Sequence, residues 1–598
     1  MATYTAPLAD MRFVLNDLLG EEQIGDLPGA DEVTPDLADA ILEEAAKVCE
    51  GLLSPLNRTG DEEGCHFDNG VVRTPQGFKE AYRTFTEGGW TSLACDTEHG
   101  GQGLPETINT MVEEMICSAN LSFGIYPGLS RGVYLALKAF GSEALKETYL
   151  PRLADGTWSG TMCLTESQCG TDLGLLNTRA TPGDDGAYKI TGTKIFISAG
   201  EHDLTENIIH LVLARTPDAP EGIRGISLFL VPKVSVAEDG SLGPANGVAC
   251  GSIEHKMGIH ASSTCVINFD DATGFLVGDL NKGMRAMFVM MNTARLAVGI
   301  QGLGLAEAAY QAAAAYARER LQGRSLGGPK CPDKPADPII VHPDVRRMLL
   351  TMRAYVEGAR ALGAWVSLHM DVAARHADAD RRRQSQDLVE LLTPVVKALF
   401  TDIGFEAGNL AVQVFGGHGY IREHGIEQYV RDARITQIYE GTNGIQALDL
   451  VGRKMPAHTG RYLRSFFHPV AAFIEEHQAD GALEEFVLPL AKAFGRLQRA
   501  TAWIAQKGLA DPEEAGAAAT EYLRLFGLVA LAYMWTRMAR LALGRGDDGG
   551  DGGDGDFHKA KLGTARFFMH RLLPQTGALF ATIMAGKGST MDFDEAWF

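Results

Sequence analysis

A change of pattern near residue 157 constrains the fold more than any other feature of the sequence. Before it, apolar residues recur at helical spacing; after it come short β-branched or alternating runs separated by Gly, Asp and Pro. These runs cover residues 189–198, 208–214, 226–231 and 264–269. Several such strands without helices between them favour an antiparallel barrel or sandwich, which we expect over residues 157–277.

Helical patterns occupy the chain on both sides of this β-region. Thr34 and Pro35 form a helix start, because the hydroxyl can cap backbone N–H groups and proline lacks an N–H where none is needed. An apolar stripe at helical spacing follows at Leu37, Ile41, Ala45, Val48 and Leu52. The sequence predicts an α+β chain in five parts: an N-terminal extension (1–33), a helical domain (34–156), the β-domain (157–277), a helical bundle (278–455) and an additional helical domain (456–598).

Charge and composition exclude several classes of function. The net charge of −22 argues against nucleic-acid binding, which requires cationic neutralisation of phosphates. The first residues lack a basic and then apolar leader, and no apolar run approaches the roughly 20 residues of a spanning helix, so we expect a cytoplasmic protein without a membrane span. The 9 cysteines form no CxxC pair, and no metal-binding motif is present, so we expect reduced thiols and no metal.

The densest signal for chemistry lies in residues 413–446. A Gly-Gly pair at 416 and 417 allows a backbone to approach a phosphate or ring closely, but no GxGxxG accompanies it. Glu440 stands two residues before Thr442, a plausible N-cap for a helix that starts near Asn443. From spacing alone, Glu440 is either a catalytic carboxylate or simply an anion placed favourably on a helix dipole.

The motifs together resemble those of the acyl-CoA dehydrogenase family, from about residue 34 to 454. The C-terminal signature of that family is matched by Tyr439-Glu440-Gly441-Thr442, by 413–419 and by Arg431-Asp432-Ala433-Arg434. Its flavin-contacting segment is matched by Met162-Cys163-Leu164-Thr165-Glu166 with Gly170-Thr171-Asp172. Further matches are Phe196-Ile197-Ser198, Glu319-Arg320 and 99–103. The family's helical, β, helical order is the order predicted above.

The resemblance implies that FAD is the cofactor, bound between the β-domain and the C-terminal helices. It implies flavin contacts from Met162, Leu164, Thr165, Gly170, Thr171, Phe196, Ile197 and Ser198. It implies that the pyrophosphate and adenosine are held by Arg320, Gln413, Gly416 and Gly417 of the neighbouring subunit, with Thr442 and Gly444 at the adenine end. The acyl-CoA contacts that it implies are Thr171, Asn292, Arg295, Tyr439 and Gly441.

Two positions depart from the family pattern. Gly323 stands where a phenylalanine is expected after Arg320, which removes an aromatic wall from the adenine site. Phe196 stands where tryptophan is usual, which keeps a ring but loses the indole N–H.

The resemblance also implies a base for the reaction. Some members carry it on an earlier helix, immediately before the arginine that matches Arg295, but here that residue is Ala294. Glu440 is therefore expected to take the α-proton of the thioester while a hydride passes to the flavin.

Three interpretations of the whole chain compete, and the third is disfavoured by the charge pattern. The first is a dehydrogenase that passes electrons to an electron-transfer flavoprotein, and the second is an acyl-CoA oxidase that uses oxygen. The third is a DNA-associated relative, but acidic residues interleave the arginines after Pro456 and leave no basic stripe. The N-terminal and C-terminal segments are similar to a long subgroup that includes thioether-chain and medium- to long-chain enzymes.

Three expectations concern the additional domain and one helix. The domain is expected to cover the bundle and leave a homodimer, with membrane docking as the rival role. The tract 544–555 is expected to be a surface loop. Glu113 and Glu114 are expected on a solvated face of a helix that contributes to the acyl pocket.

Overall fold

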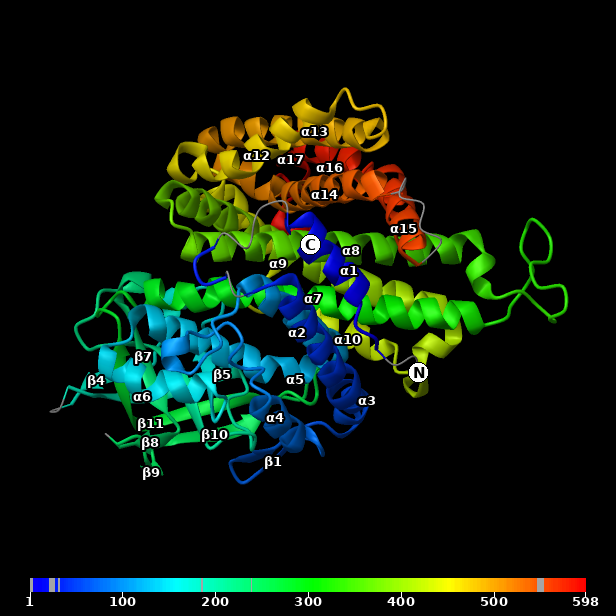
Figure 1. The fold of residues 1–598 in the computed structure, drawn as a ribbon. Helices are drawn as coiled ribbons and strands as arrows, with labels where there is room; N and C mark the ends of the chain where they lie inside the picture. The colour runs from blue at the N-terminus through cyan, green and yellow to red at the C-terminus, as the bar shows by residue number, and fades with distance from the viewer. Residues whose placement is uncertain (1–3, 21–26, 31–32, 184–185, 238, 546–552) are drawn as a thin grey trace. The chain divides into compact units, whose positions relative to one another are not determined.

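The computed structural model describes residues 4–20, 27–30, 33–183, 186–237, 239–545 and 553–598. The chain forms two compact units, whose helices and strands are drawn in Figure 1. Unit 1 comprises Met1–Ala46, Pro105–Glu114 and Val298–Phe598, and unit 2 comprises Lys47–Leu104 and Met115–Ala297.

Unit 2 contains a closed β-barrel. Hydrogen-bonded neighbours run β11-β5-β4-β6, and β7 pairs with both β6 and β11, which closes the ring. β10 and β3 extend it at two sides. The strands are β3 (Trp158–Cys163), β4 (Arg179–Pro182), β5 (Tyr188–Ser198), β6 (Asn207–Arg215), β7 (Ile226–Pro232), β10 (Val248–Ile253) and β11 (Thr264–Val277).

The pairing is antiparallel except where β3 and β4 meet β6. β3 pairs with β6 in parallel from Trp158 and Asn207 to Cys163 and Val212, and β4 adds one parallel pair at Arg179 and Arg215. A parallel pair needs a long connection between its strands. β4 and β5 lie between β3 and β6 in the chain and supply that connection.

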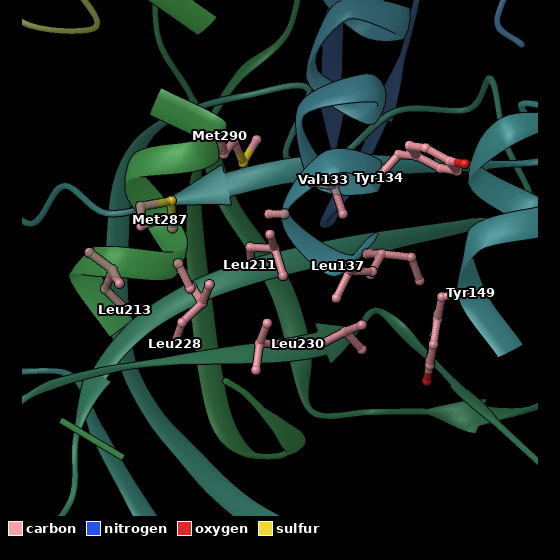
Figure 2. Packing of buried hydrophobic residues seen from close by; sticks show 14 of the residues in the cluster. Val133, Tyr134, Leu137, Tyr149, Leu211, Leu213, Leu228, Leu230, Met287 and Met290 are labelled. Carbon is pink, nitrogen blue, oxygen red and sulfur yellow. The ribbon is translucent and has the colours of Figure 1, made fainter. Parts of the chain in front are cut away.

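Strands β6 and β7 are buried on both faces, which explains their unbroken apolar sequences. Successive side chains of a strand point to opposite faces. Leu211 and Leu230 therefore join a core with the helices of unit 2, whereas Val212 and Phe229 fill the barrel interior. Figure 2 shows the first of these cores. This core also contains residues of α5 (Glu106–Phe140), α6 (Glu143–Ala154) and the start of α7 (Gly283–Glu319): Val133, Tyr134, Leu137, Tyr149, Met287 and Met290.

A long helix that enters unit 2, α5, is interrupted. α5 (Glu106–Phe140) has extended backbone at Asn120, with φ −163° and ψ 91°. The Asn120 side chain accepts a hydrogen bond from Phe123 N at 3.0 Å and donates one to Leu53 O at 3.3 Å. Asn120 thus caps the second half of the helix. Unit 2 also contains α3 (Ser54–Glu63), α4 (Phe78–Glu87), α6 (Glu143–Ala154) and the start of α7.

Unit 1 is helical. Its centre is the pair α8 (Pro343–Arg375) and α9 (Ala379–Phe415), joined by the second part of α7 (Gly283–Glu319). The N-terminal segment adds α1 (Leu8–Arg12), and most of α2 (Pro35–Val48) also belongs to this unit. The predicted cap of α2 is confirmed, because Leu37 N donates to Thr34 Oγ1 at 3.2 Å. Two short helices, α10 (Glu427–Thr436) and α11 (Asn443–Asp449), follow α9.

The additional helices pack on this bundle, as their apolar sequences predict. They are α12 (Ala457–His477), α13 (Glu484–Ala510), α14 (Pro512–Arg545), α15 (Gly553–Phe567), α16 (Gln575–Met584) and α17 (Gly588–Met591). Trp535 of α14 is fully buried and donates from Nε1 to Ala354 O of α8 at 3.0 Å. A Cβ at Gly358 would lie 2.7 Å from Trp535 Nε1, so only glycine lets α14 approach this closely.

Helix α14 is the one described helix that is long and apolar enough to cross a membrane by length and composition. No apolar run of that length was expected from the sequence. Within the fold, 67% of its apolar window is buried. The tract 544–555 falls largely on residues 546–552, which lie outside the described residues, and its described ends belong to α14 and α15 instead of the predicted loop.

Candidate active site

In unit 2, the segment 162–166 is fastened to the end of β5. Ile195 N donates to Thr165 O at 2.9 Å. The fully buried Lys194 donates from Nζ to Leu164 O at 3.0 Å and to Glu166 Oε1 at 2.8 Å. Two regions that the sequence assigned to the flavin, 162–165 and 196–198, are thereby brought together.

Glu166 and Lys194 were not singled out from the sequence. Burial raises the pKa of Glu166, but the Lys194 charge and hydrogen bonds from Lys194, Thr178 and Asn177 N outweigh it and bring the pKa to about 2. Burial also lowers the pKa of Lys194, against the attraction of Glu166. The two charges form a buried pair that fixes the backbone of 164–166. The one signal in the sequence was a lysine inside a predicted β-strand. Because side chains alternate between the two faces of a strand, that lysine could equally well have pointed to solvent.

Phe196 has unusual exposure and backbone conformation. Its φ is +58°, in the left-handed region, and the residue is 59% exposed. Its neighbour Ile197 is buried in the barrel interior at 2% exposure. An aromatic ring held outward beside the Thr165 segment is available for stacking with a planar group.

The remaining predicted residues of unit 2 lie on the loop after β3 and on α7. Gly170 and Thr171 are exposed on the loop. Asn292 and Arg295 occupy successive turns of α7, and Arg295 Nη1 donates to Asn292 Oδ1 at 3.3 Å. Arg295 is 4% exposed.

In unit 1, Glu440 lies in a tight loop between α10 and α11. Glu440 and Gly441 both have left-handed backbone, with φ of +57° and +89°. This conformation costs a non-glycine residue roughly 1–2 kcal/mol. Gln446 Nε2 donates to Glu440 O at 3.1 Å and would lie 2.7 Å from a Cβ at Gly441. Thr442 caps α11 as predicted, accepting from Ile445 N at 3.3 Å.

The neighbouring Tyr439 is anchored to α7, where its hydroxyl donates to Gln301 Oε1. Gly444 is exposed in the first turn of α11, as is the cap residue Thr442.

The end of α7 meets the loop that follows α9. The Tyr316 ring stacks on Phe415 with centroids 4.0 Å apart, and its hydroxyl lies 2.8 Å from His418 Nδ1. Arg320 is one helical turn beyond Tyr316, so it lies on the same side of the helix end. Arg320 thus follows, by one turn, a tyrosine that contacts Phe415 and His418 on either side of Gly416 and Gly417. Gln413, on the last turn of α9, is exposed.

These residues fit a flavin nucleotide. Within the part of the chain that the structure describes, the exposed Arg320 guanidinium makes no hydrogen bond or ion pair, and so is available to a phosphate. A Cβ at Gly416 or Gly417 would meet no atom within 4 Å, so packing within the chain does not explain glycine at 417. For comparison, no group of three or more His, Cys, Asp or Glu among the described residues could hold a metal ion.

Glu114 corrects one sequence expectation. It was expected on a solvated helix face, but it is 2% exposed. Arg360 of α8 donates to it from Nε, at 2.9 Å from Oε1. Burial raises the pKa of Glu114 to about 7, although the Arg360 charge opposes this. The helix pattern missed this because a buried counter-charge from a distant helix leaves no local signal.

Comparisons with known proteins agree with this organisation. Successive parts of the chain match the acyl-CoA dehydrogenase N-terminal domain (35–157), middle domain (161–272) and C-terminal domain (281–455). Residues 466–594 match the acetyl-CoA dehydrogenase C-terminal-like family. The chain is 45% identical over 584 residues to 3-methylmercaptopropionyl-CoA dehydrogenase of Ruegeria pomeroyi, covering 96% of this chain and 97% of that protein.

Two solved structures are also similar. The acyl-CoA dehydrogenase of Bacillus anthracis, complexed with FAD, matches at TM-score 0.75 and 21% identity, over 94% of this chain and 90% of that one. A chain from work on the electron transferring flavoprotein of Acidaminococcus fermentans matches at TM-score 0.58 and 26% identity, over 70% of this chain and 98% of that one. With matching models along nearly its whole length and a full-length relative, this chain belongs to the acyl-CoA dehydrogenase family and is an FAD-dependent oxidoreductase.

Proposed function

We propose that the enzyme converts an acyl-CoA thioester to the trans-2-enoyl-CoA, with Glu440 as the base that removes the α-proton. The observation that carries this is the fixed position of Glu440, a carboxylate held in left-handed backbone by Gln446 and Gly441. Residues in sparsely populated backbone regions persist only where the surroundings hold them, and they are common at active sites. A purely capping carboxylate would not require such a conformation.

The thioester α-proton is weakly acidic, so the carboxylate needs a dry site and stabilisation of the developing enolate oxygen. Exclusion of water by the substrate would raise the pKa of a carboxylate and make it a stronger base. When bound, FAD would supply the acceptor for the hydride that leaves the β-carbon.

The chain's own residues would bind and orient the two partners. Arg320 would neutralise the FAD diphosphate, with Gln413, Gly416 and Gly417 beside it, and Thr442 and Gly444 at the adenine end. Around the ring we place Met162, Leu164, Thr165, Gly170, Thr171, Phe196, Ile197 and Ser198. For acyl-CoA we assign Thr171, Asn292, Arg295, Tyr439 and Gly441.

As substrate we propose 3-methylmercaptopropionyl-CoA, with medium- or long-chain acyl-CoA as the alternative. The support is the 45% identity to an enzyme of that name along nearly the full length of both chains. As electron acceptor we propose an electron-transfer flavoprotein, supported by the similarity to a chain from the Acidaminococcus fermentans work. On the same family basis we propose a cytoplasmic enzyme of fatty-acid β-oxidation.

We also propose a homodimer that shares its flavin sites. Packing of α14 on α8 and α9 occupies a surface of the bundle that a second dimer would otherwise need. Light scattering on the holoenzyme should give a mass near twice 64.3 kDa. A mass near that of four chains would contradict the proposal that the additional domain takes the place of a second dimer.

The reaction is tested by mixing the purified, flavin-loaded enzyme with the thioether substrate and with straight-chain acyl-CoAs under anaerobic conditions. Bleaching of the flavin, with enoyl-CoA found by mass spectrometry, is the expected result. Glu440→Gln should keep the flavin and lose roughly 10²–10⁴-fold in the bleaching rate. Normal bleaching by that variant would refute the base assignment, and stoichiometric hydrogen peroxide in air without an added acceptor would identify an oxidase.

A further inference from the structure

The loop that carries Glu440 is clamped at both ends by one turn of α9. Gln437 Nε2 and Asn443 Nδ2 each donate to Asp402 Oδ1 at 2.7 Å. Asn443 N also donates to Gln437 O at 3.1 Å, which closes the loop. Residues 438–442 therefore span two points that are both fixed to Asp402.

Lys397 supplies the other side of the clamp. Its side chain is completely buried, and Nζ donates to Asn443 Oδ1 at 2.9 Å. The Asn443 amide can therefore take one orientation only, with its oxygen toward the ammonium and its nitrogen toward the Asp402 carboxylate. A reversed amide would direct N–H groups at the ammonium and oxygen at the carboxylate. Two charges of opposite sign thus fix one side chain.

The clamp extends to Glu440 through α11. Asn443 is the first residue of that helix, and Gln446, one turn later, is fully buried and donates to Glu440 O at 3.1 Å. A displacement of Asn443 would move the helix start and with it the hydrogen bond that holds Glu440. The left-handed backbone of Glu440 gives the loop no strong preference of its own for this conformation.

We infer that Lys397 and Asn443 are positioning residues for Glu440, which hold its carboxylate where it can reach the α-proton. This inference rests on the function proposed above. Lys397 acts through Asn443, and Asn443 acts through the start of α11. Displacement of a catalytic group by about 1 Å can lower a rate by roughly 10²-fold. Substitution of Lys397 or Asn443 should therefore slow proton abstraction while the flavin stays bound.

Proton abstraction can be measured apart from oxidation with 3,3-dimethylbutanoyl-CoA. This thioester has α-hydrogens but no β-hydrogen, so a C–H bond at the α-carbon can break and re-form without any hydride transfer. In D₂O, the flavin-loaded enzyme should exchange α-hydrogen for deuterium, which NMR follows. Lys397→Met should slow this exchange by roughly 10²-fold at saturating probe, with flavin content and probe affinity little changed.

Thr393→Val is the matched control. Thr393 is a buried residue of α9, one turn before Lys397, and its hydroxyl donates to Val389 O of the same helix at 2.7 Å. The Thr393→Val variant should exchange α-hydrogen at the wild-type rate. In the Glu440→Gln background, Lys397→Met should cause no further loss, because both substitutions act on one step. A merely structural role would lower the residual rate again and would refute positioning.

Asn443→Asp provides a second variant if Lys397→Met does not retain flavin. It keeps an acceptor for Lys397 but replaces the donor to Asp402 with a like charge, so slower exchange with bound flavin is expected. If Lys397→Met and Asn443→Asp both exchange at the wild-type rate, the positioning inference is wrong, but the proposed function is not affected. Rapid exchange in Glu440→Gln would instead overturn the proposed base.

Discussion

Arg360 and Glu114 form a buried ion pair in unit 1, with Arg360 Nε 2.9 Å from Glu114 Oε1 and both side chains 2% exposed. Arg360 also donates to Asp10 of the N-terminal segment and to Glu307 of α7. One guanidinium therefore joins α1, α5, α7 and α8. Three carboxylates compete for it, which favours proton uptake by one of them.

Glu114 makes stability depend on pH. Burial raises its pKa from 4.5 to about 7, so the folded protein holds a proton that the unfolded chain releases at lower pH. The resulting stabilisation is complete below about pH 4.5 and is lost as the pH rises through about 7. Glu114→Gln cannot titrate, so its melting temperature should fall less than that of the wild type between about pH 5 and 8.

Scanning calorimetry across this pH range checks the change in slope. Glu143→Gln is the control, because the Glu143 side chain is 83% exposed and its removal should leave the slope unchanged. An equal fall in melting temperature for Glu114→Gln and wild type would contradict the assignment.

Lys194→Met should loosen the segment 162–166, which is proposed to contact the flavin. It removes the donor to Leu164 O and leaves Glu166 buried without its cation, which costs about 3–5 kcal/mol. We expect weaker FAD retention during gel filtration, measured by flavin absorbance against protein. The double variant Lys194→Met/Glu166→Gln removes both charges and should recover part of the loss. Full flavin retention by the single variant would show that the pair does not hold the segment.

Trp535→Ala should destabilise the attachment of the additional domain. The indole is fully buried against α8, and truncation of a buried tryptophan typically costs about 3–5 kcal/mol. Thermal unfolding should begin at lower temperature, with earlier proteolysis after residue 456. Trp597 is 67% exposed, so Trp597→Ala is a matched control that should change stability by less than about 0.5 kcal/mol. Equal effects of the two substitutions would contradict the packing.

Arg320→Ala should lower flavin occupancy, because the exposed guanidinium is proposed to neutralise the FAD diphosphate. Excess FAD should restore occupancy and melting temperature together, since binding stabilises the folded state by mass action. Arg318→Ala removes an exposed arginine two residues earlier and should change neither the flavin occupancy nor the melting temperature. If Arg320→Ala purifies fully loaded with an unchanged melting curve, the assigned role is wrong.

The sequence alone determined the features that depend on near neighbours in the chain. The hydroxyls of Thr34 and Thr442 cap helices because each needs only a backbone N–H three residues away. The barrel strands could be predicted because β-branched runs between turn residues favour extended backbone locally. The family motifs then identified FAD and the reaction class, whereas the five-part domain division and the site roles remain predictions.

Only the tertiary structure determined which charged and polar residues, far apart in the sequence, form buried pairs. Glu114 was predicted on a solvated helix face, and Lys397 has no local signal in the sequence. Both are buried, and their partners Arg360 and Asn443 come from parts of the chain 246 and 46 residues away. The parallel pairing of β3 with β6 and the left-handed backbone of Glu440 have the same origin. In each case the local sequence permits several states of similar energy, and contacts made only after folding select one.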